Sequence, residues 1–288
     1  MAAQKNRTFH VALLAPALLF LLVFMVAPIA MLIYISFQNQ TATMQPADGF
    51  TIGRYAQILT QPQYLTDIGM TIGVALLTTL IVVALAYPAA NLIVNAKSKT
   101  IRSLLYVLLV SPLLTSVVVR TFAWIVMLSQ NGLVNQVLEK TGVITEPLSL
   151  LWNMGAVILA YVQVLLPFAV MPILTSLGDV DPALRKASMS LGAGRVRSFF
   201  KVVLPLTIPG AVNGAVIVFT LAAGSYITPL LIGGGMQPLL PLDIYQQAIQ
   251  VSDLRQAAAE AVVLLVIVFA LITPVELFLK RWEKKVYG

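Results

Sequence analysis

The sequence predicts an all-α membrane protein with six transmembrane helices and both termini in the cytoplasm. Hydrophobic residues make up 59% of the 288 residues and charged residues only 10%, and the mean hydropathy is +0.92. A soluble fold of this composition would need a very large buried interior. The apolar residues are gathered into six runs, each long enough to cross about 30 Å of hydrocarbon. Most lysines and arginines lie in the two tails and in alternate connections between these runs.

We expect one transmembrane domain over residues 1–288, with no soluble domain between the spans. The first run follows Lys5 and Arg7. Because it is longer than the apolar core of a signal peptide, about 7 to 15 residues, it should remain as a spanning helix. The expected spans are 11–37, 68–94, 104–128, 150–175, 206–232 and 258–279.

Three connections are polar and contain glycine or proline, so we expect loops there. The first loop covers 38–66, with a short interfacial helix near Tyr55–Leu59. The second covers 129–149, with a short helix at Leu133–Lys140, and the third covers 236–257. On the predicted topology all three loops are external.

The distribution of positive charge orients the spans. Fourteen of the 18 lysines and arginines lie in the two tails, in the turn between the second and third spans, and in segment 176–205. By the positive-inside rule these parts face the cytoplasm. The remaining four are Arg54, Lys140 and Arg255, on the opposite side, and Arg120, inside a span.

The composition excludes several function classes. The net charge of +7 does not indicate nucleic acid binding, because the basic residues are gathered on one side of the membrane rather than in a groove with aromatic residues. Membrane lipid is the expected surface partner. The chain has no cysteine and a single histidine, His10, so we expect neither a disulfide nor a metal centre.

The longest charged insertion between two apolar runs extends from Asp181 to Pro205 and reads DPALRKASMSLGAGRVRSFFKVVLP. Asp181 can cap a helix and Pro182 fits the first helical position, so a helix should begin here. Gly192 can adopt the left-handed conformation that ends many helices. After it, Arg195–Val203 predicts a short basic amphipathic helix that stops at Pro205.

This insertion resembles the cytoplasmic coupling loop of permease subunits of binding-protein-dependent ATP-binding cassette (ABC) importers. In that family an acidic residue and two small residues are followed by glycine and, after nine intervening residues, by an aliphatic-x-Leu-Pro ending. The spacing is kept here, although Lys186 stands where the family has the acid. The resemblance implies that the loop docks in a groove of a separate ATPase subunit. When that subunit closes, the loop transmits the movement to the transmembrane helices. The implied coupling residues are Asp181, Pro182, Arg185, Lys186, Ala187, Ser188, Gly192, Leu204 and Pro205. The alternative is an ordinary basic loop held near anionic lipid.

Arg120 lies inside the third expected span. An arginine at the centre of an isolated span costs at least about 2.5 kcal/mol, so it should face protein or water. Ser116, Arg120 and Trp124 are spaced by four and therefore share one helix face. This strip predicts a translocation path or gate. The alternative is that Arg120 reaches the external headgroups and only anchors the helix.

The fifth expected span carries a second polar stripe, which could line the path or hold helices together. Its members fall within about 80° of arc on a continuous helix. They are Asn213, Thr220, Gly224 and Thr228. On the fourth span, Gln163 and Tyr161 are two residues apart, so at most one of them can point inward.

A narrower resemblance covers about residues 54–279. The matching motifs are similar to the first permease subunit of spermidine/putrescine-type importers, and they add Tyr226 to the candidate path. They are Ser116-x3-Arg120-x3-Trp124, Leu166-Pro-Phe168 and Gly224-Ser-Tyr226-Ile-Thr228-Pro229. The resemblance implies the bacterial inner membrane, a second permease subunit, two ATPase subunits that bind ATP and Mg²⁺, and a periplasmic solute-binding protein. It also implies a polyamine or related amine as solute, with opines, amino acid derivatives and other organic solutes left open.

The sequence has no G-x4-G-K-[ST] loop, so we expect a transport subunit rather than an enzyme, without a nucleotide site or cofactor of its own. Glu260 and Glu276 lie about 24 Å apart along the sixth span, so no carboxylate pair sits at mid-membrane to support proton coupling. The alternative is a stand-alone secondary transporter or channel. A third class is a membrane enzyme or an assembly subunit that does not transport.

Overall fold

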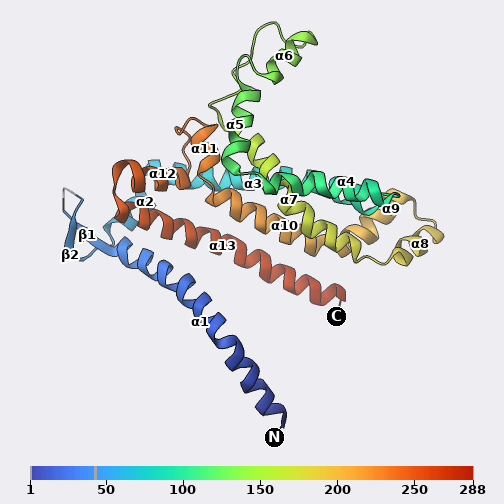
Figure 1. Ribbon diagram of the computed structural model, residues 1–288, viewed down its shortest axis with the longest axis horizontal. Coiled ribbons are helices and arrows are strands. Elements are labelled where there is room, and N and C mark those ends of the chain that lie inside the picture. Colours follow the sequence, from blue (N-terminus) through green and yellow to red (C-terminus); the bar gives the residue numbers. More distant parts are fainter. Residues whose placement is uncertain (1, 42–43, 288) are drawn as a thin grey trace. The chain divides into compact units, whose positions relative to one another are not determined.

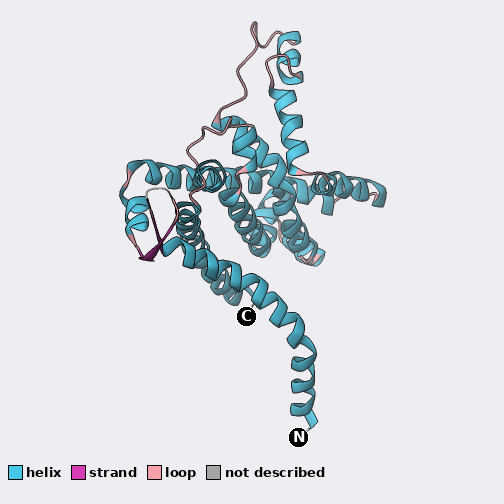
Figure 2. Cartoon of the chain, turned by 60° about the vertical axis from the view of Figure 1, so that its left-hand side comes forward, coloured by secondary structure: helices cyan, strands magenta, loops and turns pink. Residues whose placement is uncertain are grey.

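The computed structural model of the protein describes residues 2–41 and 44–287. Its backbone contacts group into two compact units: unit 1 combines 1–62 with 243–265, and unit 2 combines 63–242 with 266–288. Helices dominate both units (Figures 1 and 2). The expectation of a single domain stays a prediction.

Within the described residues, six helical stretches are long and apolar enough to cross a membrane. This number agrees with the six spans that the sequence predicts. The sidedness of the termini stays a prediction. The six stretches are Leu19–Phe37, Pro62–Val94, Val117–Lys140, Met154–Gly178, Arg195–Gly224 and Leu254–Lys284.

Unit 1 begins with helix α1 (Ala2–Phe37). The side chains of Lys5, Arg7 and His10 lie outside what the structure describes. A short antiparallel hairpin follows, which the sequence analysis did not predict and which Figure 2 shows in magenta. The predicted short helix in this loop is confirmed. The elements are β1 (Gln38–Gln40), β2 (Pro46–Phe50) and α2 (Gly53–Thr60).

The polar groups of unit 1 hold the start of the last helix, α13 (Leu254–Tyr287). Asp253 caps it, because its Oδ1 accepts a hydrogen bond of 3.0 Å from the Gln256 amide. The other carboxylate oxygen of Asp253 accepts from Gln40 Nε2 at 2.9 Å. Burial lowers the pKa of the Arg54 guanidinium, whereas the nearby Asp253 carboxylate raises it.

The third predicted loop, 236–257, is partly helical. It contains α12 (Leu240–Tyr245) and a π-helical turn, Gln246–Val251.

In unit 2, the helix α3 (Pro62–Val94) matches the second predicted span, but the third predicted span is broken. The expectation of one continuous helix over 104–128 was wrong. Pro112 provides no N–H and crowds the preceding turn, and Ser116 has an extended backbone with ψ 139°. Ser116 therefore caps a new helix instead of lying within the old one. The pieces are α4 (Lys99–Val110), a 3₁₀ turn (Ser111–Leu114) and α5 (Val117–Leu128).

The predicted short helix in the second loop is confirmed as α6 (Leu133–Lys140). Asn135 fixes it to the rest of the loop and is 0% exposed. Its Nδ2 donates to the Ser129 carbonyl at 3.1 Å, and its Oδ1 accepts from the Leu148 amide at 3.0 Å. A buried amide with both ends satisfied makes a stable loop anchor.

The core of unit 2 forms where α7 (Met154–Gly178) packs along α10 (Leu204–Gly224), as Figure 1 shows. Gly210 and Gly214 form a Gly-x3-Gly pattern that lets the two backbones approach closely. A Cβ atom added at Gly210 would lie 2.6 Å from the Pro172 carbonyl oxygen of α7. This tight contact fixes the position of one helix relative to the other.

Candidate functional site

The segment between α7 and α10 begins with helix α8 (Pro182–Ser190). Asp181 Oδ1 accepts a hydrogen bond of 2.8 Å from the Ala183 amide. The predicted cap is therefore confirmed, and a carboxylate at this end also interacts favourably with the helix dipole.

Gly192 ends α8 in the left-handed conformation that the sequence predicts, with φ +88°. The Ala193 amide donates to the Ser188 carbonyl at 3.1 Å, and the Gly192 amide donates to the Met189 carbonyl at 3.0 Å. These two bonds form a Schellman motif, which satisfies carbonyls at the helix end. The turn thus requires a positive φ at Gly192.

Two side-chain contacts hold α8 to its surroundings. The hydroxyl of Ser188 lies 2.6 Å from that of Ser198, which is 0% exposed, so α8 is joined to the following helix. Arg185 Nη1 donates to Asn95 Oδ1 at 3.4 Å and joins α8 to the turn after α3. Sequence reasoning missed Ser198 and Asn95, because only the folded loop brings them to these partners.

The predicted stop at Pro205 was wrong. The helix α9 (Arg195–Ser198) runs through a π-helical turn, Phe199–Val203, directly into α10. The Leu204 amide bonds to the Phe199 carbonyl five residues back, which is the wider spacing of a π turn. Pro205 then sits in the first turn of α10, where a missing N–H costs little.

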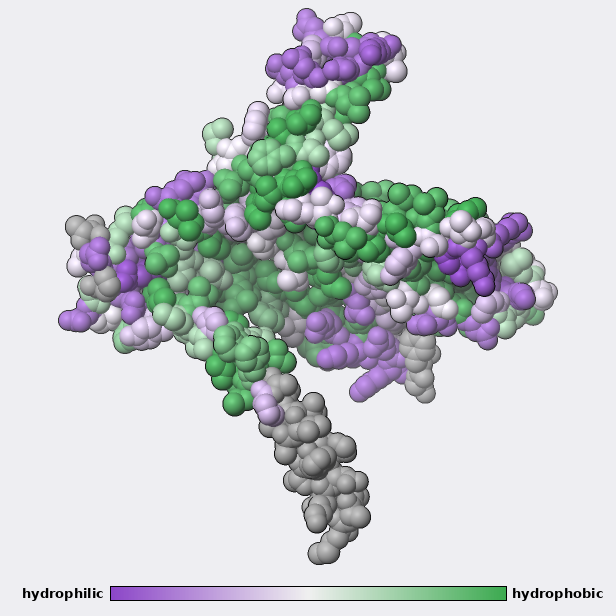
Figure 3. Space-filling view, viewed as in Figure 1, coloured by the Kyte–Doolittle hydropathy of each residue, from purple (hydrophilic) through white to green (hydrophobic). Residues whose placement is uncertain are grey.

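The surface of this segment carries apolar side chains beside basic ones, and Figure 3 shows this mixture around α8 and α9. Leu191 is 89% exposed, which is high for a large apolar residue. Lys186 is also exposed. Exposed apolar residues with a charged rim are typical of a docking surface. We call the apolar set the loop face; it consists of Leu184, Met189, Leu191, Val196 and Phe200.

At the opposite end of the α7–α10 pair, a groove of about 790 Å³ opens between α5, α7, α10 and the segment that follows α10. Six of the nine predicted path residues line it. These six are Ser116, Arg120, Thr220, Gly224, Tyr226 and Thr228. The structure thus brings them together, and their role as a path remains a prediction.

The groove exists because the fifth predicted span is interrupted. The expected continuous span 206–232 was wrong, since α10 ends at Gly224 and a short helix, α11 (Ile227–Leu231), follows. Pro229 disfavours helical continuation, because its ring would meet the Ser225 carbonyl four residues back. That carbonyl instead accepts a hydrogen bond of 2.8 Å from the Tyr161 hydroxyl. Thr228 therefore enters the groove through this break and not through the predicted stripe.

The other three predicted path residues do not line the groove. Trp124 Nε1 donates to Gln163 Oε1 at 3.2 Å, so these two side chains pair with each other. Asn213 is exposed at a different place on α10. Of the two candidates on the fourth span, Tyr161 lines the groove and Gln163 does not.

Arg120 is the one charged side chain among the described residues that line the groove. Its Nε and Nη1 atoms are shielded from solvent and have no hydrogen-bond partner within the described part of the chain. Arg120 as a whole is only partly buried, but leaving shielded N–H groups without a partner is costly. The arrangement therefore favours a ligand or another subunit that supplies an acceptor.

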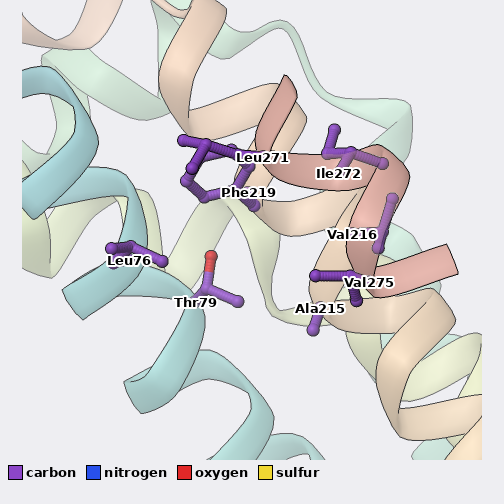
Figure 4. Close-up of a pocket in the computed structure, with 8 residues that line it drawn as sticks. All are labelled: Leu76, Thr79, Ala215, Val216, Phe219, Leu271, Ile272 and Val275. Carbon is purple, nitrogen blue, oxygen red and sulfur yellow. The ribbon is translucent and has the colours of Figure 1, made fainter. Parts of the chain in front are cut away.

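A second cavity in unit 2 has a different chemistry (Figure 4). It measures about 260 Å³ and lies between α3, α10 and α13. Thr79 is its one polar lining residue, and the Thr79 hydroxyl already donates to the Ala75 carbonyl at 2.7 Å. A polar solute would find no partner here, so the groove is the better candidate for a path. The other lining residues are Leu76, Ala215, Val216, Phe219, Leu271, Ile272 and Val275.

Comparison with known families shows which family the chain belongs to. Residues 63–286 match the family model described as "Binding-protein-dependent transport system inner membrane component". The chain belongs to this family. It is a transmembrane permease subunit of an ABC importer and a multi-pass protein of the bacterial inner membrane.

Individual relatives narrow the comparison. The chain is 32% identical over 247 residues to the spermidine/putrescine transport system permease protein PotB of Salmonella typhimurium, covering 86% of this chain and 85% of that one. It is 31% identical to PotB of Escherichia coli K12, with 86% and 89% covered.

A solved structure shares the fold. A permease chain of a bacterial ABC transporter involved in the import of the acidic polysaccharide alginate aligns with a TM-score of 0.77, at 19% identity and with 96% of both chains covered. The helical permease fold is therefore confirmed over nearly the whole chain.

Proposed function

We propose that this permease subunit forms half of the translocation path for a small organic amine and that segment 181–205 couples the path to a separate ATPase. The observation that carries the proposal is the placement of the two sites. The segment that carries the loop face joins the end of α7 to the start of α10, and the groove lies at the other ends of the same two helices. Polyamines are the first solutes to test, because two relatives are spermidine/putrescine permeases.

The coupling depends on rigid connections between α8, α9, α10 and α7. The Ser188–Ser198 contact and the Schellman turn make α8 and α9 one compact unit. Since α9 continues without a stop into α10, a force on α8 is passed directly to α10. The close contact at Gly210 transmits it to α7. Rocking of these two helices would open or close the groove, as in other transporters that alternate between outward and inward access.

The proposed function implies several partner proteins. ATP and Mg²⁺ would be bound by two copies of a cytoplasmic ATPase, and a second permease subunit would supply the other half of the path. A periplasmic protein would deliver the solute and make the main selection. The concentration of lysine and arginine on the side of the loop face supports a cytoplasmic position for it.

Replacing Leu191 with aspartate should remove most of the ATPase that co-purifies with this chain. The substitution puts a carboxylate at the most exposed apolar position of the loop face, 89% exposed, and a charge buried in an interface is costly. We expect retention to fall by about tenfold, which corresponds to about 1.4 kcal/mol. The measurement is the ATPase-to-permease ratio after affinity purification.

The matched control is Met236→Asp, because Met236 is 83% exposed in the loop that follows α11. It should leave the ratio unchanged. Equal loss in both variants, or purification of the unaltered chain as a homodimer without any ATPase, would contradict the proposal. The second outcome would favour a stand-alone transporter or channel.

A further inference from the structure

Another cavity of unit 2 opens where the C-terminal ends of α3 and α7 meet the first two turns of α4. It measures about 580 Å³, within the range of about 300–1,000 Å³ that is usual for small-ligand sites. We call it the α4 pocket. None of its lining residues belongs to the groove or to the loop face. They are Ile93, Val94, Lys99, Arg102, Ser103, Tyr106, Leu174 and Gly178.

The polar groups of the α4 pocket come from one face of α4. Their spacing of i, i+3, i+4 and i+7 places them within about 100° of arc on a helix. The opposite face is apolar and exposed, which suits contact with hydrocarbon. In a membrane, α4 would therefore turn its apolar face to lipid and hold its two positive charges beside the pocket. The polar face consists of Lys99, Arg102, Ser103 and Tyr106, and the apolar face includes Ile101, Leu104 and Leu108.

Arg102 is fixed over the end of α3. Its Nη2 donates to the Val94 carbonyl at 3.0 Å and to the Ala96 carbonyl at 3.3 Å. Its Nε and Nη1 make no hydrogen bond to the described residues, and neither Arg102 nor Lys99 forms an ion pair with any of them. A guanidinium held in this way loses little conformational freedom when an anion binds. Both cations can therefore donate to an anion in the pocket.

The other side of the α4 pocket is apolar. Ile93 and Val94 end α3, and Leu174 lies near the end of α7. A free anion would use only the basic side and leave the apolar side in contact with water. A phospholipid matches both sides, because its phosphate is linked through glycerol to its acyl chains.

We propose that the α4 pocket binds an anionic phospholipid. The phosphate binds Lys99 and Arg102 through charge-assisted hydrogen bonds. The hydroxyls of Ser103 and Tyr106 add further donors, and the first acyl carbons lie against the apolar side. On the predicted topology the pocket faces the cytoplasmic leaflet, where basic pockets between transmembrane helices bind anionic headgroups. This site is independent of the solute and of the contact with the ATPase.

The test is photo-cross-linking in the assembled transporter, reconstituted in nanodiscs of phosphatidylcholine. Two probe lipids with identical acyl chains and a diazirine close to the glycerol are compared at the same low mole fraction. One is phosphatidylglycerol, which has a net negative charge, and the other is phosphatidylcholine, in which choline cancels the phosphate charge. The cross-linked residues of this chain are identified by mass spectrometry after proteolysis.

We expect phosphatidylglycerol to cross-link within 93–106 and 174–178 at least about tenfold more than phosphatidylcholine, because each basic residue near a membrane surface favours an anionic lipid by about fivefold. Lys99→Gln should lower this yield by about fivefold, and Lys99→Arg should keep it. The matched control is Lys97→Gln, which removes the same charge from the same turn. Lys97 is exposed and does not line the pocket, so the yield should stay unchanged.

Four outcomes would overturn the inference. Equal yields from the two lipids would show that the headgroup charge is not recognised. Equal losses in Lys97→Gln and Lys99→Gln would show general attraction to a basic surface. Displacement of the probe by an excess of glycerol 3-phosphate would show a site for a free phosphate group. Cross-links that appear only after the permease is separated from its partners would show that a partner protein covers the pocket.

Discussion

Replacing Gly192 with valine should reduce ATP-driven uptake by at least about tenfold while the protein still inserts into the membrane. Gly192 has φ +88°, and the left-handed conformation costs an L-residue roughly 1–2 kcal/mol, with β-branched residues the least tolerant. Each 1.4 kcal/mol is a factor of about ten in the population of the intact turn. A Cβ atom at this position would meet nothing within 4 Å, so the effect arises from the backbone alone.

The chain offers a matched control two residues away. Gly194 has φ −64° and equally open surroundings, so Gly194→Val should transport nearly normally. Gly192→Asn should recover part of the activity, because asparagine tolerates positive φ better than valine. Uptake is measured in proteoliposomes that contain the complete transporter. Full-rate uptake by Gly192→Val, with normal insertion, would show that the turn does not transmit motion.

Replacing Gly210 with valine should have the second large effect, which is loss of stability and of transport together. A Cβ atom there would lie 2.5 Å from Ser176 Cβ and 2.6 Å from the Pro172 carbonyl oxygen. Because one of these contacts is with backbone, α7 and α10 must move apart. Overpacking of this kind costs typically about 1–3 kcal/mol, and occasionally more. We expect a lower melting temperature of the purified permease and little uptake.

The control for this variant is Gly73→Val on α3, where an added Cβ atom meets nothing within 4 Å. It should melt within a degree or two of the unaltered protein, which is the scatter expected of surface substitutions. If Gly210→Val melted like Gly73→Val, the two backbones would not be in close contact.

Several features were predictable from the sequence because local chemistry determines them. The number of spans follows from apolar length, the start of α8 from Asp181 and Pro182, and its end from Gly192. The short helix Leu133–Lys140 was also predicted at its observed bounds. Each of these depends on residues close to one another in the chain. The Gly-x3-Gly pattern at Gly210 could have been read in the same way, from spacing alone.

Other features depend on contacts between distant segments. Prolines are tolerated inside membrane helices when neighbours satisfy the freed backbone groups, so the sequence did not show which of them break a helix. Pro167 lies within α7, whereas Pro229 accompanies a break in which Tyr161 satisfies the Ser225 carbonyl. The polar stripe of the fifth expected span placed Asn213 on the path, because that span was assumed to be one unbroken helix.

The proposed coupling role requires that the loop face lies on the cytoplasmic side and contacts the ATPase subunit. Because the chain has no cysteine, Leu191→Cys provides a single site for a maleimide that carries a photo-cross-linker. The account predicts labelling by a membrane-impermeant maleimide in inside-out vesicles only, and a light-induced cross-link from this site to the ATPase subunit in the assembled transporter. Labelling from the periplasmic side, or a site that never cross-links to the ATPase, would contradict it.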